Sequence, residues 1–325
     1  MFGPKPGLKE KIRIDKVHHP PYPRHAPNSY IRSIFNPFIM KHLILSLSIF
    51  SVLVLGSCGQ SGNNGEATAQ DSTAIQDSLD AAAGIQRKGG LTLSLLGESP
   101  AYPDAKLSLV VPKDLQKLKK GDVDFEFGVE NYQLGAQTAD AQGKGIANSD
   151  KGQHIHFILN NGPYTAYYEP KVKTPLEDGD YVLLAFLARS YHESLKTPGA
   201  FVLKQFTVGK SNTSKMDESG KVDLNAPHLF FSRPKGKYVG PAETEKLLLD
   251  FYLVNCDLGP DGYKVRATIN GNDFMLTKWA PYVVEGLPLG EVKIKLELLD
   301  KDNQLVASPF NPVERTATLE AATAP

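Results

Sequence analysis

Short segments in which hydrophobic and polar residues alternate recur along the chain after residue 90. The clearest are Leu91–Leu95, Phe125–Val129, Ile155–Leu159 and Val292–Leu298. Gly, Pro, Asn and Asp separate such segments at a spacing of about ten residues. Alternation places every second side chain on the same face of a β-strand. The pattern therefore predicts an all-β protein built from β-sandwiches.

The same order of strand and turn residues occurs twice. The pattern that runs from Phe125 to Asn131 recurs from Leu249 to Asn255, and the register slips where the first copy carries the polar insertion 136–151. A repeat of this kind predicts two tandem immunoglobulin-like sandwiches. The predicted segments are domain one, 91–209, a polar linker, 210–224, domain two, 225–320, and a short tail, 321–325.

Residues 43–55 form a strongly apolar run that contains three serines and no charged residue. A helix of this length spans only about 20 Å, which is short of the roughly 30 Å hydrocarbon core of a bilayer. Lys41 precedes the run, and the small residues Gly56 and Ser57 follow it. This order is typical of a signal peptide, and the alternatives are a buried helix or a short membrane anchor.

The run ends in Leu55-Gly56-Ser57-Cys58, which resembles a bacterial lipobox. The resemblance implies that Cys58 is diacylated on its sulfur, becomes the mature N-terminus and anchors the protein in a membrane of the cell envelope, most naturally the outer membrane. Met40 is then the natural start of a signal peptide over residues 40–57. Residues 1–39, with their Pro and His runs, are interpreted as a mis-assigned upstream segment, disordered and without function.

Residues 58–90 are rich in Gly, Ser, Asn, Ala, Gln and Asp and contain few bulky side chains. Such a segment cannot bury a core, so it is predicted to be a flexible tether. The tripeptides that begin at Asp71 and Asp77 resemble the Asp-Ser/Thr-aliphatic O-glycosylation motif of Bacteroidetes. The resemblance implies modification at Ser72 and Ser78.

Charge is balanced over the whole chain but not along it. Of 36 Lys and Arg and 36 Asp and Glu residues, residues 1–57 hold eight of the bases and two of the acids, which leaves 28 bases and 34 acids in the remainder. A mildly acidic body argues against nucleic-acid binding. Two cysteines cannot form a disulfide framework, and with Cys58 acylated, Cys256 is expected to be a packed thiol.

Sequence motifs of the common enzyme classes are missing. The chain has no Gly-x-Ser-x-Gly, no phosphate-binding loop, no Gly-x-Gly-x-x-Gly after a strand and no His-Glu-x-x-His. We therefore expect a non-enzymatic binding or interaction module without a required cofactor and with a protein of the envelope as a candidate partner. A metal-binding envelope protein and an envelope hydrolase are the alternatives.

The first repeat contains Ser99-Pro100, Phe127-Gly128-Val129 and Gly152-Gln-His154-Ile-His156 in that order. This order resembles a widespread, poorly characterised domain of extracytoplasmic bacterial proteins that carries a Gly-His-x-His strand. The resemblance implies a β-sandwich but no particular activity. The whole layout is also similar to Bacteroidetes lipoproteins that are labelled phosphopeptide-binding, yet the chain lacks the arginine cluster that phosphate recognition uses.

Comparison of the two copies separates core positions from outward positions. On the strand at 154–159, His154 and His156 occupy positions that Lys264 and Arg266 fill in the second copy. Core packing therefore does not require histidine there. Both histidines are expected on the solvent face of the strand.

The strand at 181–188 is apolar on both faces. Its outward row is Val182, Leu184 and Phe186, where the second copy has charged residues. Such a row requires a cover, and the candidates are the second domain, the insertion 136–151 and an external partner or ligand. Including nearby aromatic and polar residues, the candidate ligand or partner surface comprises Tyr164, Tyr167, Val182, Leu184, Phe186, Arg189 and Tyr191.

Three histidines of the first repeat form a candidate metal site. His154 and His156 lie two residues apart on one strand, so both rings project from the same face about 6.5–7 Å apart along the strand. His192 follows the end of the strand that is expected to lie beside them. Three imidazoles suit zinc or copper with one open coordination position. The alternatives are surface histidines without a ligand and histidines that contact an organic ligand or partner.

Overall fold

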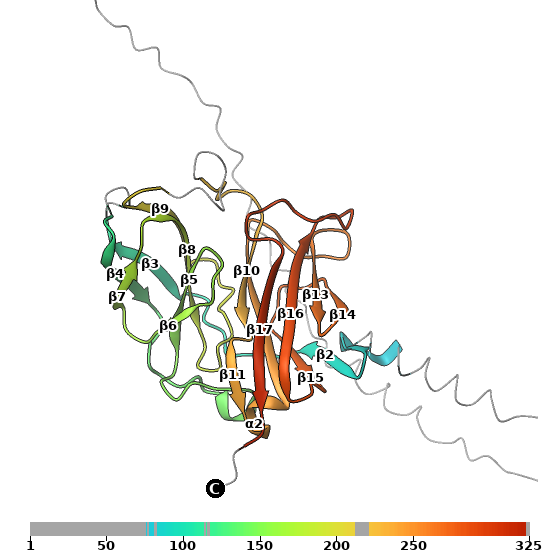
Figure 1. Ribbon diagram of the computed structural model, residues 1–325. Coiled ribbons are helices and arrows are strands. Elements are labelled where there is room, and N and C mark those ends of the chain that lie inside the picture. Colours follow the sequence, from blue (N-terminus) through green and yellow to red (C-terminus); the bar gives the residue numbers. More distant parts are fainter. Residues whose placement is uncertain are drawn as a thin grey trace, which may run out of the picture. The chain divides into compact units, whose positions relative to one another are not determined.

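The computed structural model describes residues 76, 78–80, 83–113, 115, 118–211 and 221–322 (Figure 1). The predicted signal peptide, Cys58, Ser72 and most of the linker 210–224 lie outside the described residues. By its internal contacts the chain divides into one unit over residues 1–63 and another over residues 64–325, and the described residues all belong to the second unit.

The first sandwich consists of a three-stranded sheet and a four-stranded sheet, and all neighbouring strands are antiparallel. Phe125, Ile155 and Leu183 lie in the core between the sheets, as the alternation predicts. The first sheet has the order β3 (Lys106–Val111), β4 (Gly121–Glu130), β7 (Lys171–Leu176). The second has the order β6 (Thr165–Tyr167), β5 (His154–Leu159), β8 (Gly179–Ala188), β9 (Phe201–Val208).

The second sandwich consists of two five-stranded sheets around a core that includes Phe251, Val265 and Leu296. One sheet has the order β1 (Gln86–Lys88), β2 (Leu91–Leu95), β15 (Tyr282–Glu285), β12 (Lys246–Val254), β10 (His228–Arg233). The other has the order β11 (Gly236–Val239), β17 (Val313–Glu320), β16 (Gly290–Leu299), β13 (Lys264–Ile269), β14 (Asn272–Leu276). The described structure also contains the short helices η1 (Ala141–Gly143) and α2 (Pro241–Thr244) and helical residues at 78–80.

The strand order confirms the predicted all-β class with two immunoglobulin-like sandwiches. Strands β3-β4-β7 of the first sandwich correspond to β10-β12-β15 of the second, and β6-β5-β8-β9 correspond to β14-β13-β16-β17. Equivalent asparagines end equivalent strands with positive φ: Asn131 (54°) and Asn255 (56°) after β4 and β12, Asn160 (50°) and Asn270 (45°) after β5 and β13. Asparagine tolerates this left-handed backbone better than other residues with a Cβ, which explains why the repeat retains it.

The boundary between tether and first domain differs from the prediction. Leu91–Leu95 was expected to open domain one, but as β2 it pairs with β15 and belongs to the second sandwich. Leu91 and Leu93 are buried in the core of that sandwich. The predicted tether ends earlier as well, because β1 pairs with β2. Alternation identifies a strand and its buried face, but it does not identify the sheet that the strand joins.

The outward face of β8 packs against the second sandwich. Val182, Leu184 and Phe186 are fully buried in a cluster that also contains Phe230 and Tyr252. The rings of Phe186 and Tyr252 stack at a centroid distance of 4.6 Å. The sequence left three candidates for covering this apolar row, and the structure shows that the second domain covers it. These three side chains are not available as a surface for an external ligand, contrary to the sequence-based assignment.

Polar contacts fix the register of the two sandwiches. Asn161, at the end of β5, donates hydrogen bonds to the carbonyl oxygens of Leu229 (3.1 Å) and Phe310 (3.0 Å) in the second sandwich. The backbone N–H of Phe231 donates to the side-chain oxygen of Asn161 at 2.9 Å. The side-chain amide of Asn161 is buried and fully hydrogen-bonded in this arrangement. A shift of one sandwich along the other would leave these polar groups unpaired, which disfavours any other docking.

The apolar interface yields a direct test. We expect Phe186→Ala to lower the free energy of unfolding by about 3–5 kcal/mol, because it removes a fully buried ring and leaves a cavity between the sandwiches. Leu289→Ala is the matched control: Leu289 is 58% exposed, so its truncation should change stability by less than about 0.5 kcal/mol. Chemical denaturation of both variants measures the difference, and equal losses would contradict the interface.

Candidate metal centre

Strand β5 presents His154 and His156 on the face that turns towards the second sandwich. In the antiparallel register His154 lies opposite Ala188 and His156 opposite Phe186 of β8. The rings of His156 and Phe186 are 5.1 Å apart between centroids. The two histidines therefore continue the row of side chains that the second sandwich covers.

His192 reaches the pair from the loop that follows β8. Its backbone is left-handed, with φ of 69°. The turn is closed by two hydrogen bonds: the N–H of His192 donates to the carbonyl of Arg189 at 2.8 Å, and the N–H of Arg189 donates to the carbonyl of Glu193 at 2.9 Å. A positive φ is strained for a residue with a Cβ and is often found where a functional side chain must be placed. Here it turns the imidazole towards His154.

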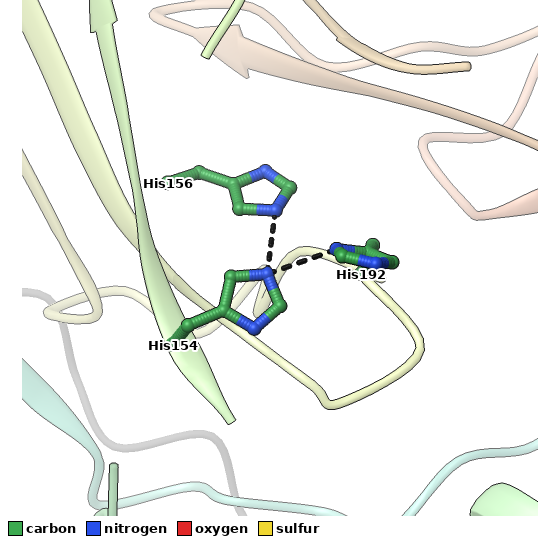
Figure 2. Close-up of side chains that lie close together, drawn as sticks. All are labelled: His154, His156 and His192. Carbon is green, nitrogen blue, oxygen red and sulfur yellow. Dashed lines mark hydrogen bonds between the residues drawn. The ribbon is translucent and has the colours of Figure 1, made fainter. Parts of the chain in front are cut away.

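The three rings bring one nitrogen each to a common point. Figure 2 shows dashed lines from one ring nitrogen of His154, Nε2, to the rings of both other histidines. This Nε2 lies 2.9 Å from Nε2 of His156 and 3.0 Å from Nδ1 of His192. All three nitrogens lie within 4.8 Å of one another. The two-residue spacing predicted that His154 and His156 lie side by side, and the loop after β8 adds His192.

The other ring nitrogens of the strand pair have partners of their own. Nδ1 of His154 lies 2.8 Å from the carbonyl oxygen of Gly152, which can only accept, so this Nδ1 carries the proton and Nε2 keeps a free lone pair. Nδ1 of His156 lies 3.1 Å from the hydroxyl oxygen of Ser232 on β10. Outer hydrogen bonds of this kind orient histidines that coordinate metals.

The prediction that these histidines face solvent is wrong. His154 and His156 have no exposed surface, and His192 is half-buried. They do point away from the core of the first sandwich, as comparison of the copies indicated. The second sandwich covers the face, and strand β10 places Ser232 and Arg233 against it.

Burial and neighbouring charge keep the three imidazoles neutral. Burial lowers the pKa of His154 to about 4, and burial together with the positive charges of Arg233 and Lys235 lowers the pKa values of His156 and His192 well below the usual value. Neutral rings present lone pairs, and a lone pair is what a metal ion requires of histidine.

Tyr164 closes one side of the cluster. Its ring stacks on that of His156, with centroids 3.6 Å apart and planes within 9°. Its hydroxyl oxygen lies 3.4 Å from Nδ1 of His192 and accepts a hydrogen bond from Nη1 of Arg233 at 2.9 Å. The ammonium group of Lys235 lies 4.5 Å from the centroid of the same ring. Of the predicted surface residues, Tyr164 stacks on His156 and has its hydroxyl beside His192, and Phe186 also lies beside His156.

The remaining residues of the predicted surface have structural contacts. Tyr167 packs on Phe157 in the core of the first sandwich, and its hydroxyl pairs with Thr174 at 2.7 Å. Arg189 is buried and forms a 3.0 Å ion pair with Glu193.

Tyr191 is also buried. It packs with Ala141 and Ile146 of the 136–151 insertion against Leu248 and Val283 of the second sandwich. The same cover that buries β8 therefore removes Tyr191, too, from the surface.

Sequence reasoning missed Ser232 and Arg233. Both belong to the second repeat, 40 or more residues from the nearest of the three histidines. Neither stands in a motif that points to the site. Ser78, a predicted glycosylation site, is exposed in a short helical segment. Cys58 and Ser72 lie outside the described residues. Within the described part of the chain, no helix is long and apolar enough to cross a bilayer.

No protein-family model matches the sequence, and no curated protein is similar to it. Among solved structures, the chain is similar to fibronectin(III)-like modules of Clostridium thermocellum CbhA (14% identity, 66% of this chain and 95% of that one, TM-score 0.23). It is also similar to the central fibronectin-III array of RIM-binding protein (8%, 70% and 72%, TM-score 0.23).

A third similar structure is the Bacteroides ovatus mixed-linkage glucan utilization protein SGBP-B in complex with a heptasaccharide (10%, 66% and 47%, TM-score 0.18). Likenesses with TM-scores this low carry no argument about ligand or activity. The immunoglobulin-like assignment follows from the strand order itself.

The backbone at His192 allows the ring to be removed with little loss of stability. We expect His192→Gly to change the free energy of unfolding of the metal-free protein by less than about 1 kcal/mol, because glycine relieves the left-handed strain while the half-buried ring is lost. His156→Ala should cost about 2–4 kcal/mol, since its ring is fully buried under Tyr164. Urea denaturation in the presence of a chelator measures both, and comparable losses would contradict the assigned backbone strain.

Proposed function

We propose that this protein is a non-enzymatic, lipid-anchored binding protein of the cell envelope, and that its ligand is a transition-metal ion held by His154, His156 and His192. The observation that supports the ligand is the convergence of three imidazole nitrogens on one point. The two sandwiches serve as the scaffold that buries and orients them.

The distances support coordination with little rearrangement. Around a tetrahedral ion with bonds of about 2.0–2.1 Å, ligand nitrogens lie about 3.3 Å apart. The shortest separations at the centre are 2.9 Å and 3.0 Å. Side-chain rotations that widen these two separations by a few tenths of an ångström, and bring the nitrogens of His156 and His192 from within 4.8 Å to a similar separation, would admit the ion.

Hydrogen bonds among the three rings do not account for both short contacts of His154 at once. The single lone pair on Nε2 of His154 faces two ring nitrogens at hydrogen-bonding distance, and it can accept a well-aligned proton from only one of them. Nδ1 of His192 has the hydroxyl of Tyr164 as its other neighbour, at 3.4 Å. An ion at the common point would use all three lone pairs at once, which makes coordination the arrangement that fits the donors best.

The surroundings favour binding over hydrolysis. Within the described part of the chain, no carboxylate hydrogen-bonds to any of the three rings. Metal-dependent hydrolases pair the ion with a water molecule and a general base. The groups beside this centre are a serine, a tyrosine and two cationic side chains, and none of them is a carboxylate.

Metal binding is tested by calorimetric titration of the detergent-solubilised full chain after chelator treatment. We expect one Zn²⁺ or copper ion per chain with a dissociation constant below about 1 μM, and a loss of at least roughly 100-fold in His192→Gly. Asn303→Gly is the matched control, because Asn303 also has a positive φ (60°) but lies in an exposed turn. Binding weaker than about millimolar, or equal binding by both variants, would refute the proposal.

The anchor has a test of its own. Mass spectrometry of the membrane-extracted protein should find a diacylglyceryl group on Cys58 at the mature N-terminus, and Cys58→Ala should leave the precursor uncleaved and without lipid. Two acyl chains give stable membrane attachment where one gives only marginal binding. Cys256→Ala is the control and should be processed normally. A free N-terminus elsewhere in the wild-type protein would end the lipoprotein interpretation.

A further inference from the structure

We infer that the three-histidine centre selects monovalent copper over divalent ions such as zinc, so that the protein acts as a binder of cuprous ions. The inference rests on the proposed metal-binding function and extends it to the identity of the ion. It follows from three properties of the site: the number of donors, the sign of the surrounding charge, and the aromatic packing.

Within the residues that the structure describes, the site offers three strong donors and no fourth of comparable strength. A further polar atom beside it is the hydroxyl oxygen of Tyr164, 3.4 Å from Nδ1 of His192, which already accepts a hydrogen bond from Arg233. Structural zinc sites use four protein ligands, and catalytic zinc sites complete their shell with water. Cuprous copper, a closed-shell ion, is satisfied by three ligands in a trigonal arrangement. The donor count therefore suits Cu⁺ without any addition.

The charges around the site are positive. Arg233 is buried and donates to Tyr164, and Lys235 places its ammonium group over the ring of the same tyrosine. In the described part of the chain, neither cation forms an ion pair with a carboxylate. Repulsion between a bound ion and these side chains scales with the charge of the ion. A divalent ion is consequently repelled twice as strongly as a monovalent one.

The rings around the centre strengthen this effect. Tyr164 stacks on His156, Phe186 lies 5.1 Å from His156, and Tyr168 lies 5.0 Å from His154 between ring centroids. Aromatic packing around buried imidazoles excludes water and lowers the local dielectric constant, so each unit of uncompensated charge costs more than it would at the surface. A soft, singly charged ion with a weak demand for water is the one that this environment tolerates best.

The three ligands differ in how far they are buried. His154 and His156 are fully buried, whereas His192 is half-buried and belongs to a loop. His192 is therefore the ligand that solvent reaches most readily. A binding site with one ligand at the surface is suited to accepting and releasing its ion, in contrast to a closed structural site.

The test compares ions under anaerobic conditions with the full chain in detergent. Cu⁺, kept reduced with ascorbate, is measured by competition with bicinchoninate, and Zn²⁺ by competition with a fluorescent chelator. We expect one Cu⁺ per chain, bound roughly 1,000-fold more tightly than Zn²⁺, and an X-ray absorption spectrum of three nitrogen ligands. His192→Gly should abolish this binding, and Asn303→Gly should retain it.

A charge variant tests the electrostatic step separately. Lys235→Gln should raise the affinity for Zn²⁺ by about threefold to tenfold and that for Cu⁺ by less, because the removed repulsion is larger for the divalent ion. Lys237→Gln is the control: Lys237 is two residues along the chain and pairs with Glu320 at 2.8 Å, so its removal should change neither affinity.

The outcomes separate this inference from the function on which it rests. Binding of Zn²⁺ as tight as that of Cu⁺, still abolished by His192→Gly, would overturn the copper preference and leave the metal centre standing. Failure of both ions to bind, or binding that His192→Gly does not change, would overturn the metal centre and the copper preference together.

Discussion

The packing of β8 against the second sandwich is the interaction on which the rest of the structure depends. Its outward row of Val182, Leu184 and Phe186 is too apolar to face water, and burial against Phe230 and Tyr252 removes it from solvent. The equivalent strand of the second sandwich carries charged residues outward and is not covered in this way. The difference between apolar and charged residues on this one strand thus decides that the outer face of β8, and not that of β16, is covered by the other sandwich.

The burial of the histidines is a consequence of that packing. His154 and His156 lie on the same sheet face as the apolar row, so whatever covers the row also covers them. Alternation along β5 and comparison of the repeats were enough to predict that both rings leave the core. They were not enough to predict burial, because a period of two residues shows which side chains share a face and gives no information about what lies opposite.

The same limit explains the other differences between prediction and structure. Leu91–Leu95 has the pattern of a strand in either sandwich, and only its pairing with β15 decides between them. Ser232 and Arg233 join the histidines through docking of a distant repeat, for which the sequence carries no local signal. The approach of His192 depends on a single left-handed residue in a loop, whereas the asparagines with the same backbone were visible as a repeated feature.

Docking and the proposed ion binding are therefore linked. The first sandwich supplies the three nitrogens, and the second supplies the hydroxyl that meets His156 and the cations that set the charge of the site. A ligand that binds only the docked form stabilises docking by RT ln(1 + [L]/Kd), or about 2.7 kcal/mol at a hundred times Kd. Reciprocally, separation of the sandwiches would expose the rings to water and remove the neighbouring cations. The properties of the centre then belong to the pair of domains, and neither repeat contains them alone.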